Sequence, residues 1–276
     1  MFSALAWGIG DFGGGLASRR VPSATVVLWA QGFGGLIAAA VAIARGEVLP
    51  DLHDAAWGMA GGAFGAMALT AFYHGLATGR IGVVAPVAAV LGAAIPVLVA
   101  AAIVGPPGTL QLVGMAVGVA GIGLVSRPPT EGHGANSGIG VAVLAGVGIG
   151  ASFLAMGQIR GESVFAALAI GRIAAVATML VVITRAGHPA RPPRAIAPML
   201  AVVAALDLGG VAGFTLAAQL GRVDISAVLS SMYPVVTILL AAVILRERVG
   251  RLQVAGIALA MSAIALIGSG LASPLP

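Results

Sequence analysis

Residues 221–248 read GRVDISAVLSSMYPVVTILLAAVILRER and have the length and composition of a membrane-spanning helix with one polar stripe. At about 100° per residue, the hydroxyl side chains fall on one narrow helix face: Ser226, Ser230, Tyr233 and Thr237. Pro234 cannot donate a hydrogen bond to the carbonyl of Ser230, and a free carbonyl at membrane depth is tolerated only against protein or a wet cavity. The stripe therefore predicts a cavity wall that binds a polar substrate. The alternative is that each hydroxyl bonds to a backbone carbonyl one turn earlier.

The composition of the whole chain indicates an integral membrane protein. Of its 276 residues, 59% are hydrophobic and only 8% are charged, whereas a soluble domain has about 25% charged residues. The absence of cysteine excludes disulfides and thiolate nucleophiles, and the absence of lysine excludes a Walker-type phosphate loop and Schiff-base chemistry. The arginines behind the net charge of +5 are dispersed over short loops, so we expect no nucleic-acid partner. The loop histidines His53, His133 and His188 lack metal-ligand spacing, so we expect no metal and no cofactor.

Apolar runs of the length that a bilayer-crossing helix needs alternate with short polar breaks. We expect ten spans, at about 2–17, 22–44, 55–78, 81–103, 109–126, 138–158, 163–184, 197–220, 223–245 and 251–270. Residues 131–137 form the predicted linker between a first five-helix repeat at 1–130 and a second at 138–276. The expected fold class is thus an all-α integral membrane protein with ten transmembrane helices in two inverted five-helix repeats.

An internal match supports the division into two halves. At an offset of 142 residues, 79–126 align with 221–268 without a gap, and 12 of the 48 positions are identical. Because five crossings are an odd number, the second repeat would be inverted relative to the first. Inverted repeats are typical of secondary transporters, which bind their substrate near the membrane midplane between the halves.

The distribution of arginine predicts an orientation. If the N-terminus were cytoplasmic, the cytoplasmic loops would hold three arginines and the opposite loops ten. The positive-inside rule therefore favours both termini on the outside.

Short motifs in both halves carry a resemblance to a known transporter family. They are Trp7-Gly8, Arg172, Tyr233-Pro234, Glu247-Arg248 and Leu252-Gln253-x-x-Gly256. In these the chain resembles the EamA family of the drug/metabolite transporter superfamily. The first half departs from the pattern, since Gly105-Pro106 stands where Glu-Arg is usual and Leu91-Gly92 where Tyr-Pro is usual. The resemblance implies export of small polar metabolites such as amino acids, a multi-pass location in a bacterial plasma membrane, and cytoplasmic termini, against the arginine count.

Ionisable groups within a membrane span are costly and are therefore functional candidates. Four stand out in this chain: Asp11, His74, Arg172 and Asp207. We expect Asp11 and Asp207 to be ion-coupling residues that bind and release a proton as the cavity opens. The other interpretation is that one of them forms a structural ion pair with Arg172, for which we expect a structural role. His74 is either a proton relay or an interfacial histidine.

Aromatic side chains complete the predicted substrate cavity, although aromatics in membrane helices also serve as packing groups and interfacial anchors. The full predicted substrate-binding set is Trp7, Asp11, Tyr73, His74, Asp207, Phe214, Ser226, Ser230, Tyr233 and Thr237.

Two other functions compete with transport. Gly8-Ile9-Gly10-Asp11 matches the Gly-x-Gly-Asp pattern of intramembrane aspartyl proteases, with Asp207 as the second carboxylate of a dyad. However, the Pro-Ala-Leu motif is absent and the order of the two acids is reversed, so we expect no enzyme. A lipid flippase or a membrane scaffold is the other alternative. Small-xxx-small glycine pairs such as Gly58/Gly62 indicate close helix packing, and they are also compatible with a homodimer.

Overall fold

The structure is a computed structural model, and it describes residues 2–79, 81–103, 108–125, 138–219, 230, 233–246 and 250–271. Within these ranges all regular secondary structure is helical, with ten α-helices and one short 3-10 helix. The elements are α1 (Phe2–Ser18), α2 (Ser23–Ala44), α3 (Leu52–Thr78), α4 (Ile81–Ile103), α5 (Thr109–Val125), α6 (Ile139–Met156), α7 (Val164–Ala186), η1 (Arg194–Ile196), α8 (Ala197–Gln219), α10 (Tyr233–Ile244) and α11 (Arg251–Leu271).

Nearly every predicted span coincides with a helix to within a few residues. Five of the described helical segments are long and apolar enough to cross a membrane: Ser23–Ala44, Leu52–Thr78, Ile139–Met156, Val164–Ala186 and Arg194–Ala217. Shorter apolar segments lie at Ile81–Pro96, Leu112–Gly121, Tyr233–Ile244 and Val254–Ile267. Most of the first part of the span predicted at 223–245 lies outside the described residues, so α10 represents only its second part.

Local chemistry sets several helix ends. The carboxylate of Asp51 accepts a hydrogen bond of 2.8 Å from the backbone N–H of Asp54 and so caps the start of α3, as an N-cap aspartate commonly does. At the end of α7, Gly187 takes a left-handed conformation with φ of 64°, which glycine adopts without a steric penalty. These caps fix where the chain leaves each helix and therefore where the connecting loops lie.

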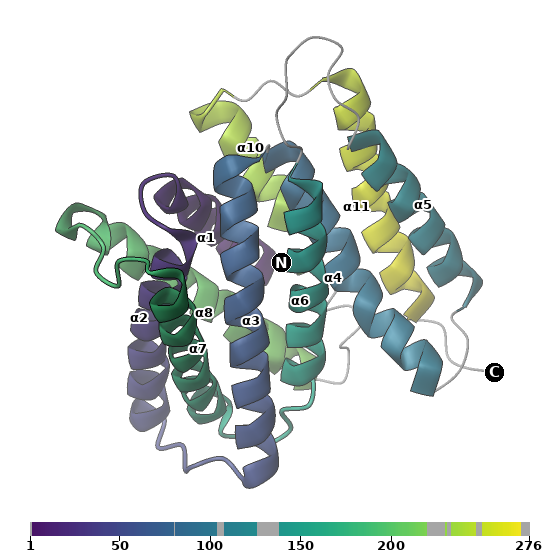
Figure 1. Ribbon diagram of the computed structural model, residues 1–276. Coiled ribbons are helices and arrows are strands. Elements are labelled where there is room, and N and C mark those ends of the chain that lie inside the picture. The colour runs from purple at the N-terminus through teal and green to yellow at the C-terminus, as the bar shows by residue number, and fades with distance from the viewer. Residues whose placement is uncertain are drawn as a thin grey trace.

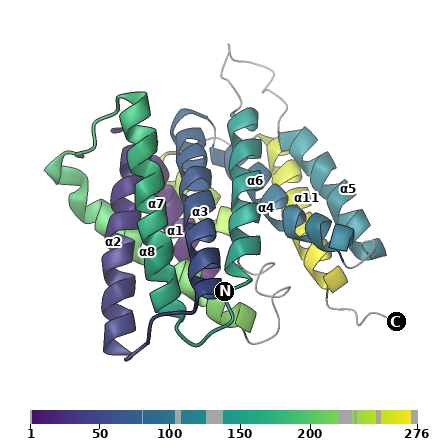
Figure 2. The same ribbon diagram turned by 60° about the horizontal axis from the view of Figure 1, so that its bottom comes forward.

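The helices form two groups that α4 joins (Figures 1 and 2). In the larger group α2 packs on α7 and α8, α3 on α6 and α7, and α1 on α8 and α10. The smaller group is the pair α5 and α11, which lie side by side at one edge and contact α4.

Glycine permits a close crossing between α3 and α7. A Cβ atom on Gly58 would lie 2.6 Å from the carbonyl oxygen of Ala167, and a Cβ atom on Gly171 would lie 2.5 Å from the carbonyl oxygen of Gly58. The backbones of α3 and α7 approach this closely only because these positions lack a side chain.

The loops divide into two sets at opposite ends of the bundle. The α2–α3 and α6–α7 connections meet at one end, at the bottom of Figure 1, and we call this end the acidic face because it carries Glu47, Asp51, Asp54 and Glu162. The α1–α2 and α7–α8 connections meet at the other end, where Thr25 donates a hydrogen bond of 2.7 Å to the carbonyl of Pro189. We call this end the basic face because it carries Arg19, Arg20, Arg185, Arg191 and Arg194.

Candidate functional site

A cavity of about 80 Å³ lies inside the larger helix group. One water molecule needs roughly 10–15 Å³ by the same kind of measure, so the cavity holds a few waters or a small molecule. Its walls come from helices of both halves of the chain, α1, α2 and α3 on one side and α6, α7, α8 and α10 on the other. Four of the predicted substrate-binding residues line it together with the predicted structural arginine: Trp7, Asp11, Asp207 and Tyr233, with Arg172.

A buried ion pair joins α7 to α8 in the cavity wall. The Nη1 atom of Arg172 lies 2.6 Å from Oδ2 of Asp207, and both side chains are only 7% exposed. The same nitrogen donates to the side-chain carbonyl of Gln31 on α2. The Nη2 atom of Arg172 is buried and has no hydrogen-bond partner among the described residues. The acid that pairs with Arg172 is thus Asp207 and not Asp11, and the pair leaves one guanidinium nitrogen without a partner in the described part of the chain.

Asp11 has a different environment from Asp207. It is 6% exposed, and the hydroxyl of Tyr73 on α3 is its polar neighbour. Tyr73 reaches this position because its ring lies on Gly14, one turn further along α1, where any Cβ atom would collide with the ring. Among the described residues, no ion pair gives Asp11 a cationic partner.

Stacked aromatic rings form one wall of the site. Phe153 on α6 stacks on Phe214 of α8 with ring centroids 4.9 Å apart and on Trp7 of α1 at 5.6 Å. The indole of Trp7 lies against Gly210, which leaves room for it on α8. A second contact joins Phe72 and Tyr233 edge to face at 5.9 Å. Rings from α1, α3, α6, α8 and α10 thus surround the charged groups with apolar surface.

The predicted hydroxyl stripe divides into residues with different environments. Tyr233 lines the cavity, and its buried hydroxyl has no hydrogen-bond partner in the described part of the chain. Ser230 is buried but is not among the cavity-lining residues. Thr237 donates to the carbonyl of Gly8 at 3.1 Å and to that of Tyr233 at 3.2 Å, which is the backbone-bonding alternative. Ser226 lies outside the described residues.

Three other predicted residues lie outside the group that lines the cavity. His74 is exposed and lies in a separate surface groove with Thr70, Met67 and Leu144. Tyr73 and Phe214 lie just behind the lining, where they contact Asp11 and the aromatic wall. The structure therefore brings together the two acids, the arginine and the aromatics, and it places His74 away from them.

Sequence reasoning missed three side chains of the site. Gln31 bonds to Arg172, and its position as a lone amide in the middle of an apolar run was an available signal. Phe153 and Phe72 complete the aromatic contacts. For these two residues the sequence offered no signal, because most apolar residues in a membrane helix bundle contact either lipid or another helix.

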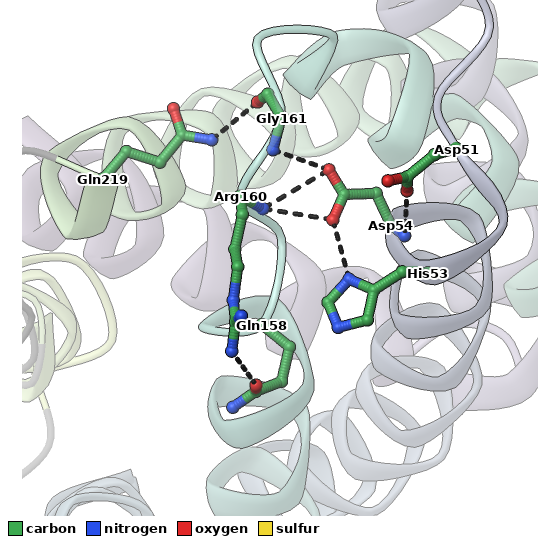
Figure 3. Close-up of polar contacts among 7 residues, drawn as sticks. All are labelled: Asp51, His53, Asp54, Gln158, Arg160, Gly161 and Gln219. Atoms are coloured by element: carbon green, nitrogen blue, oxygen red, sulfur yellow. Dashed lines mark hydrogen bonds and ion pairs between the residues drawn. The ribbon is translucent and has the colours of Figure 1, made fainter.

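A polar cluster at the acidic face is a second group that sequence reasoning did not anticipate (Figure 3). Asp51, His53 and Asp54 each have a side-chain oxygen or nitrogen of the kind that binds metal ions. These atoms lie within 4.8 Å of one another. The carboxylate of Asp54 accepts hydrogen bonds from the backbone N–H groups of Gly161 at 2.7 Å and Arg160 at 3.1 Å. Its side-chain partner is His53, whose Nδ1 lies 3.1 Å from Oδ1. This carboxylate therefore holds the α6–α7 loop against the start of α3.

Comparison with known proteins gives a family match for the second half of the chain. Residues 136–269 match the EamA-like transporter family. A solved crystal structure of a protein with 19% sequence identity aligns with a TM-score of 0.59, covering 96% of this chain and 97% of that chain. At this identity the likeness concerns the fold alone. None of the curated proteins matches the sequence.

The family match agrees with the apolar helices and with the motifs of the second half. Of these motifs, Tyr233-Pro234 opens α10, whereas Glu247-Arg248 lies outside the described residues. Residues 136–269 thus match the EamA-like transporter family, a family of the drug/metabolite transporter superfamily, and the apolar helices with this match support an integral membrane protein.

Proposed function

We propose that the protein is a secondary active transporter that moves small polar metabolites out of a bacterial cell across its plasma membrane. Alternating access between the two halves would expose one central site to each side of the membrane in turn. The observation that carries this proposal is the convergence of Asp11, Arg172 and Asp207, all buried, on one cavity lined by helices from both halves. Buried ionisable groups at membrane depth are costly and mark substrate or ion pathways.

The pattern of helix contacts supports two inverted repeats and ten transmembrane helices. Exchange of the halves pairs α1 with α6, α2 with α7, α3 with α8, α4 with α10 and α5 with α11. Under this exchange the observed contact α1–α8 maps onto α3–α6, α2–α8 maps onto α3–α7, and α1–α10 maps onto α4–α6, all of which also occur. The contacts α2–α7, α4–α10 and α5–α11 map onto themselves. A pseudo-twofold axis between the halves accounts for all of these contacts.

The residues that line the cavity support the same inverted repeat, with the pseudo-twofold axis passing through the cavity. Adding the sequence offset of 142 to four lining residues gives four other lining residues: Trp7 and Ile149, Asp11 and Phe153, Gly65 and Asp207, and Leu69 and Val211. The charges do not follow the repeat, since Asp11 and Asp207 have uncharged counterparts. In the proposed site the two halves therefore contribute equivalent backbone positions, but the side chains at these positions differ in charge.

Asp11 is the stronger candidate for proton coupling. Asp207 already forms an ion pair with Arg172, whereas the polar neighbour of Asp11 is the neutral hydroxyl of Tyr73. When all three cavity groups are ionised, two negative charges and one positive charge leave a net charge of −1, which a proton on Asp11 would neutralise. Asp207 and Arg172 would then hold α7 and α8 in place around the site.

The substrate would contact Trp7, Phe153 and Tyr233, which line the cavity. The buried hydroxyl of Tyr233 and the Nη2 atom of Arg172 lack partners among the described residues, and buried polar atoms normally form hydrogen bonds. A polar substrate would supply the missing partners. Ser230 would position Tyr233 from one turn away, Phe214 and Tyr73 would support the walls, and Thr237 would hold α10 to α1.

The alternatives receive less support from the geometry. In an aspartyl protease two carboxylates share one proton, but here Asp207 is engaged by Arg172. A flippase or scaffold would not need three ionisable groups in one cavity. Small molecule and membrane lipid are the proposed partners, and a homodimer would use glycine-rich helix faces outside the cavity.

Reconstitution in liposomes tests the proposal. Purified protein should accelerate the movement of small polar metabolites, amino acids first, and a pH gradient should drive their accumulation. Peptide cleavage that requires Asp11 and Asp207 would favour the protease, and scrambling of fluorescent lipid would favour the flippase. The proposal would be overturned if the protein moved no metabolite but showed either peptide cleavage or lipid scrambling.

A further inference from the structure

We propose that Asp54 is a latch that holds the cavity closed toward the acidic face, and that this latch exists on one side of the protein only. The inference rests on the proposed function, because it assigns a state of the alternating-access cycle to a set of hydrogen bonds. Its evidence lies in the cluster drawn in Figure 3, which is separate from the residues that line the cavity.

The Asp54 carboxylate is built to hold the α6–α7 loop. The residue is only 4% exposed, and both of its oxygens accept hydrogen bonds from consecutive backbone N–H groups, at 2.7 Å from Gly161 and at 3.1 and 3.3 Å from Arg160. Charge-assisted bonds of this kind are stronger than those between neutral groups. Gly161 is required for the approach, since a Cβ atom there would lie 2.7 Å from Oδ2 of Asp54.

Neighbouring groups fix both partners of the latch. Asp51 caps the backbone N–H of Asp54 at 2.8 Å, and His53 contacts its Oδ1 at 3.1 Å. On the loop side, Gln219 at the end of α8 donates to the carbonyl of Gly161 at 2.9 Å. The latch therefore joins α3 of the first half to the α6–α7 loop and to α8 of the second half.

The latch lies at one end of the cavity. Gly58, which lines the cavity, follows Asp54 by one helical turn of α3. Ile159, which also lines the cavity, directly precedes Arg160. Separation of the α3 start from the loop would move these two lining residues apart. An opening of the cavity that separates α3 from this loop would therefore break the hydrogen bonds of Asp54.

The sequence offset of 142 residues shows that another hydrogen bond between the halves occurs at equivalent places on both faces. On the acidic face Glu47 accepts a hydrogen bond of 2.9 Å from the backbone N–H of Ala166. The counterpart of Glu47 is residue 47 + 142 = 189, and Pro189 accepts from Thr25 at 2.7 Å on the basic face. Residue 25 + 142 = 167 is next to Ala166. A hydrogen bond that is present at both ends favours neither the state open to the acidic face nor the state open to the basic face.

The Asp54 latch has no such counterpart. Residue 54 + 142 = 196 is Ile196, a buried apolar side chain in η1 that cannot accept a hydrogen bond. The additional hydrogen bond of the basic face is a single neutral one, from Trp29 Nε1 to the carbonyl of Ala190 at 2.7 Å, whereas the acidic face has three contacts to one carboxylate. The two faces therefore differ in the chemistry of their closure. The latch would bias the resting protein toward the state closed at the acidic face, so that the cavity opens there only when the latch releases.

The absence of native cysteine allows a direct test by single-cysteine labelling. Ser152→Cys places a thiol in the cavity lining, and a membrane-impermeant maleimide reports its access from each aqueous side of proteoliposomes. Glu162→Cys, at an exposed position of the same loop, identifies which side is the acidic face. In the Ser152→Cys background, Asp54→Ala should raise the labelling rate from that side about tenfold, equivalent to about 1.4 kcal/mol.

Two further variants keep the test decisive. Gly161→Ala keeps the Asp54 carboxylate but pushes the α6–α7 loop away from it, so it should raise the labelling rate in the same way. This variant tests the latch if Asp54→Ala fails to fold. Glu162→Gln removes a neighbouring exposed acid and should leave labelling at the parent rate. Unchanged labelling in folded Asp54→Ala and Gly161→Ala protein overturns the latch. Because labelling needs no substrate, a failure of the latch is distinguishable from a failure of transport, which is measured separately as metabolite flux.

Discussion

Arg172 Nη1 and Asp207 Oδ2 lie 2.6 Å apart in a pair that is almost completely shielded from solvent. The pair joins α7 to α8 beside the cavity, and Gln31 extends it to α2. Removal of one partner from a buried pair leaves an uncompensated charge and typically costs about 3–5 kcal/mol, whereas removal of both partners costs much less. The relationship between these two residues therefore makes a prediction about folding that is separate from transport.

Asp207→Leu should lower the free energy of unfolding by about 3–5 kcal/mol. The double variant Arg172→Met/Asp207→Leu should recover much of this loss, because no charge then remains unpaired. Unfolding in mixed detergent micelles at increasing denaturant measures both values. A double variant less stable than either single variant would show that the pair is not the source of the effect.

Tyr233→Phe should weaken substrate binding without lowering the free energy of unfolding. The reason is that Tyr233 lines the cavity and its hydroxyl has no protein partner among the described residues. Ser230→Val is the matched comparison on the same helix face and should affect affinity less. Unchanged affinity in both variants would remove the hydroxyl stripe from the binding site.

Thr237→Val should behave in the opposite way. Its hydroxyl bonds the carbonyl of Gly8 across the α1–α10 contact, and a net contribution of about 1 kcal/mol is typical for such a bond. We expect a loss of about that size in unfolding free energy and an unchanged substrate affinity. A large change in affinity without a change in stability would place this hydroxyl in the binding site instead.

Gly14→Val tests the support behind Asp11. A side chain at this position would collide with the ring of Tyr73, and overpacking typically costs about 1–3 kcal/mol. Thermal unfolding should show the loss. The control is Gly32→Val, because a Cβ atom on Gly32 would meet open space. Equal stability of the two variants would contradict the packing described for Tyr73.

The sequence predicted the helices well because a long apolar run in a membrane protein must satisfy its backbone polar groups internally, as a helix does. It also indicated that an acid could pair with Arg172, since an unpaired charge is costly at membrane depth. The choice between Asp11 and Asp207 needed the structure, because helix spacing along the chain does not say which helices are neighbours. Tyr73 illustrates the same limit, since it meets Asp11 only where Gly14 leaves space.

The latch at Asp54 was beyond sequence reasoning for a different reason. Its partners are backbone N–H groups of Arg160 and Gly161, which every residue except proline possesses, so no side-chain pattern signals them. Phe153 was missed because one apolar residue in an apolar helix does not reveal which of its neighbours is aromatic. These contacts depend on tertiary arrangement and not on local periodicity.

Orientation is open to a direct measurement. The basic face carries most of the described loop arginines, so the positive-inside rule places it in the cytoplasm and both termini outside. A reporter that is active only in the cytoplasm, fused after Pro276, should then be inactive. An active reporter would support the orientation implied by the family resemblance and would put the acidic face in the cytoplasm.

Proton coupling through Asp11 is tested by metabolite flux driven by a pH gradient in proteoliposomes. Parent protein should accumulate substrate when the gradient is imposed, whereas Asp11→Asn should transport substrate only down its own gradient, at a rate that no longer responds to pH. The folded Asp11→Asn protein must elute as the parent does in detergent. Accumulation by Asp11→Asn equal to that of the parent would contradict the account.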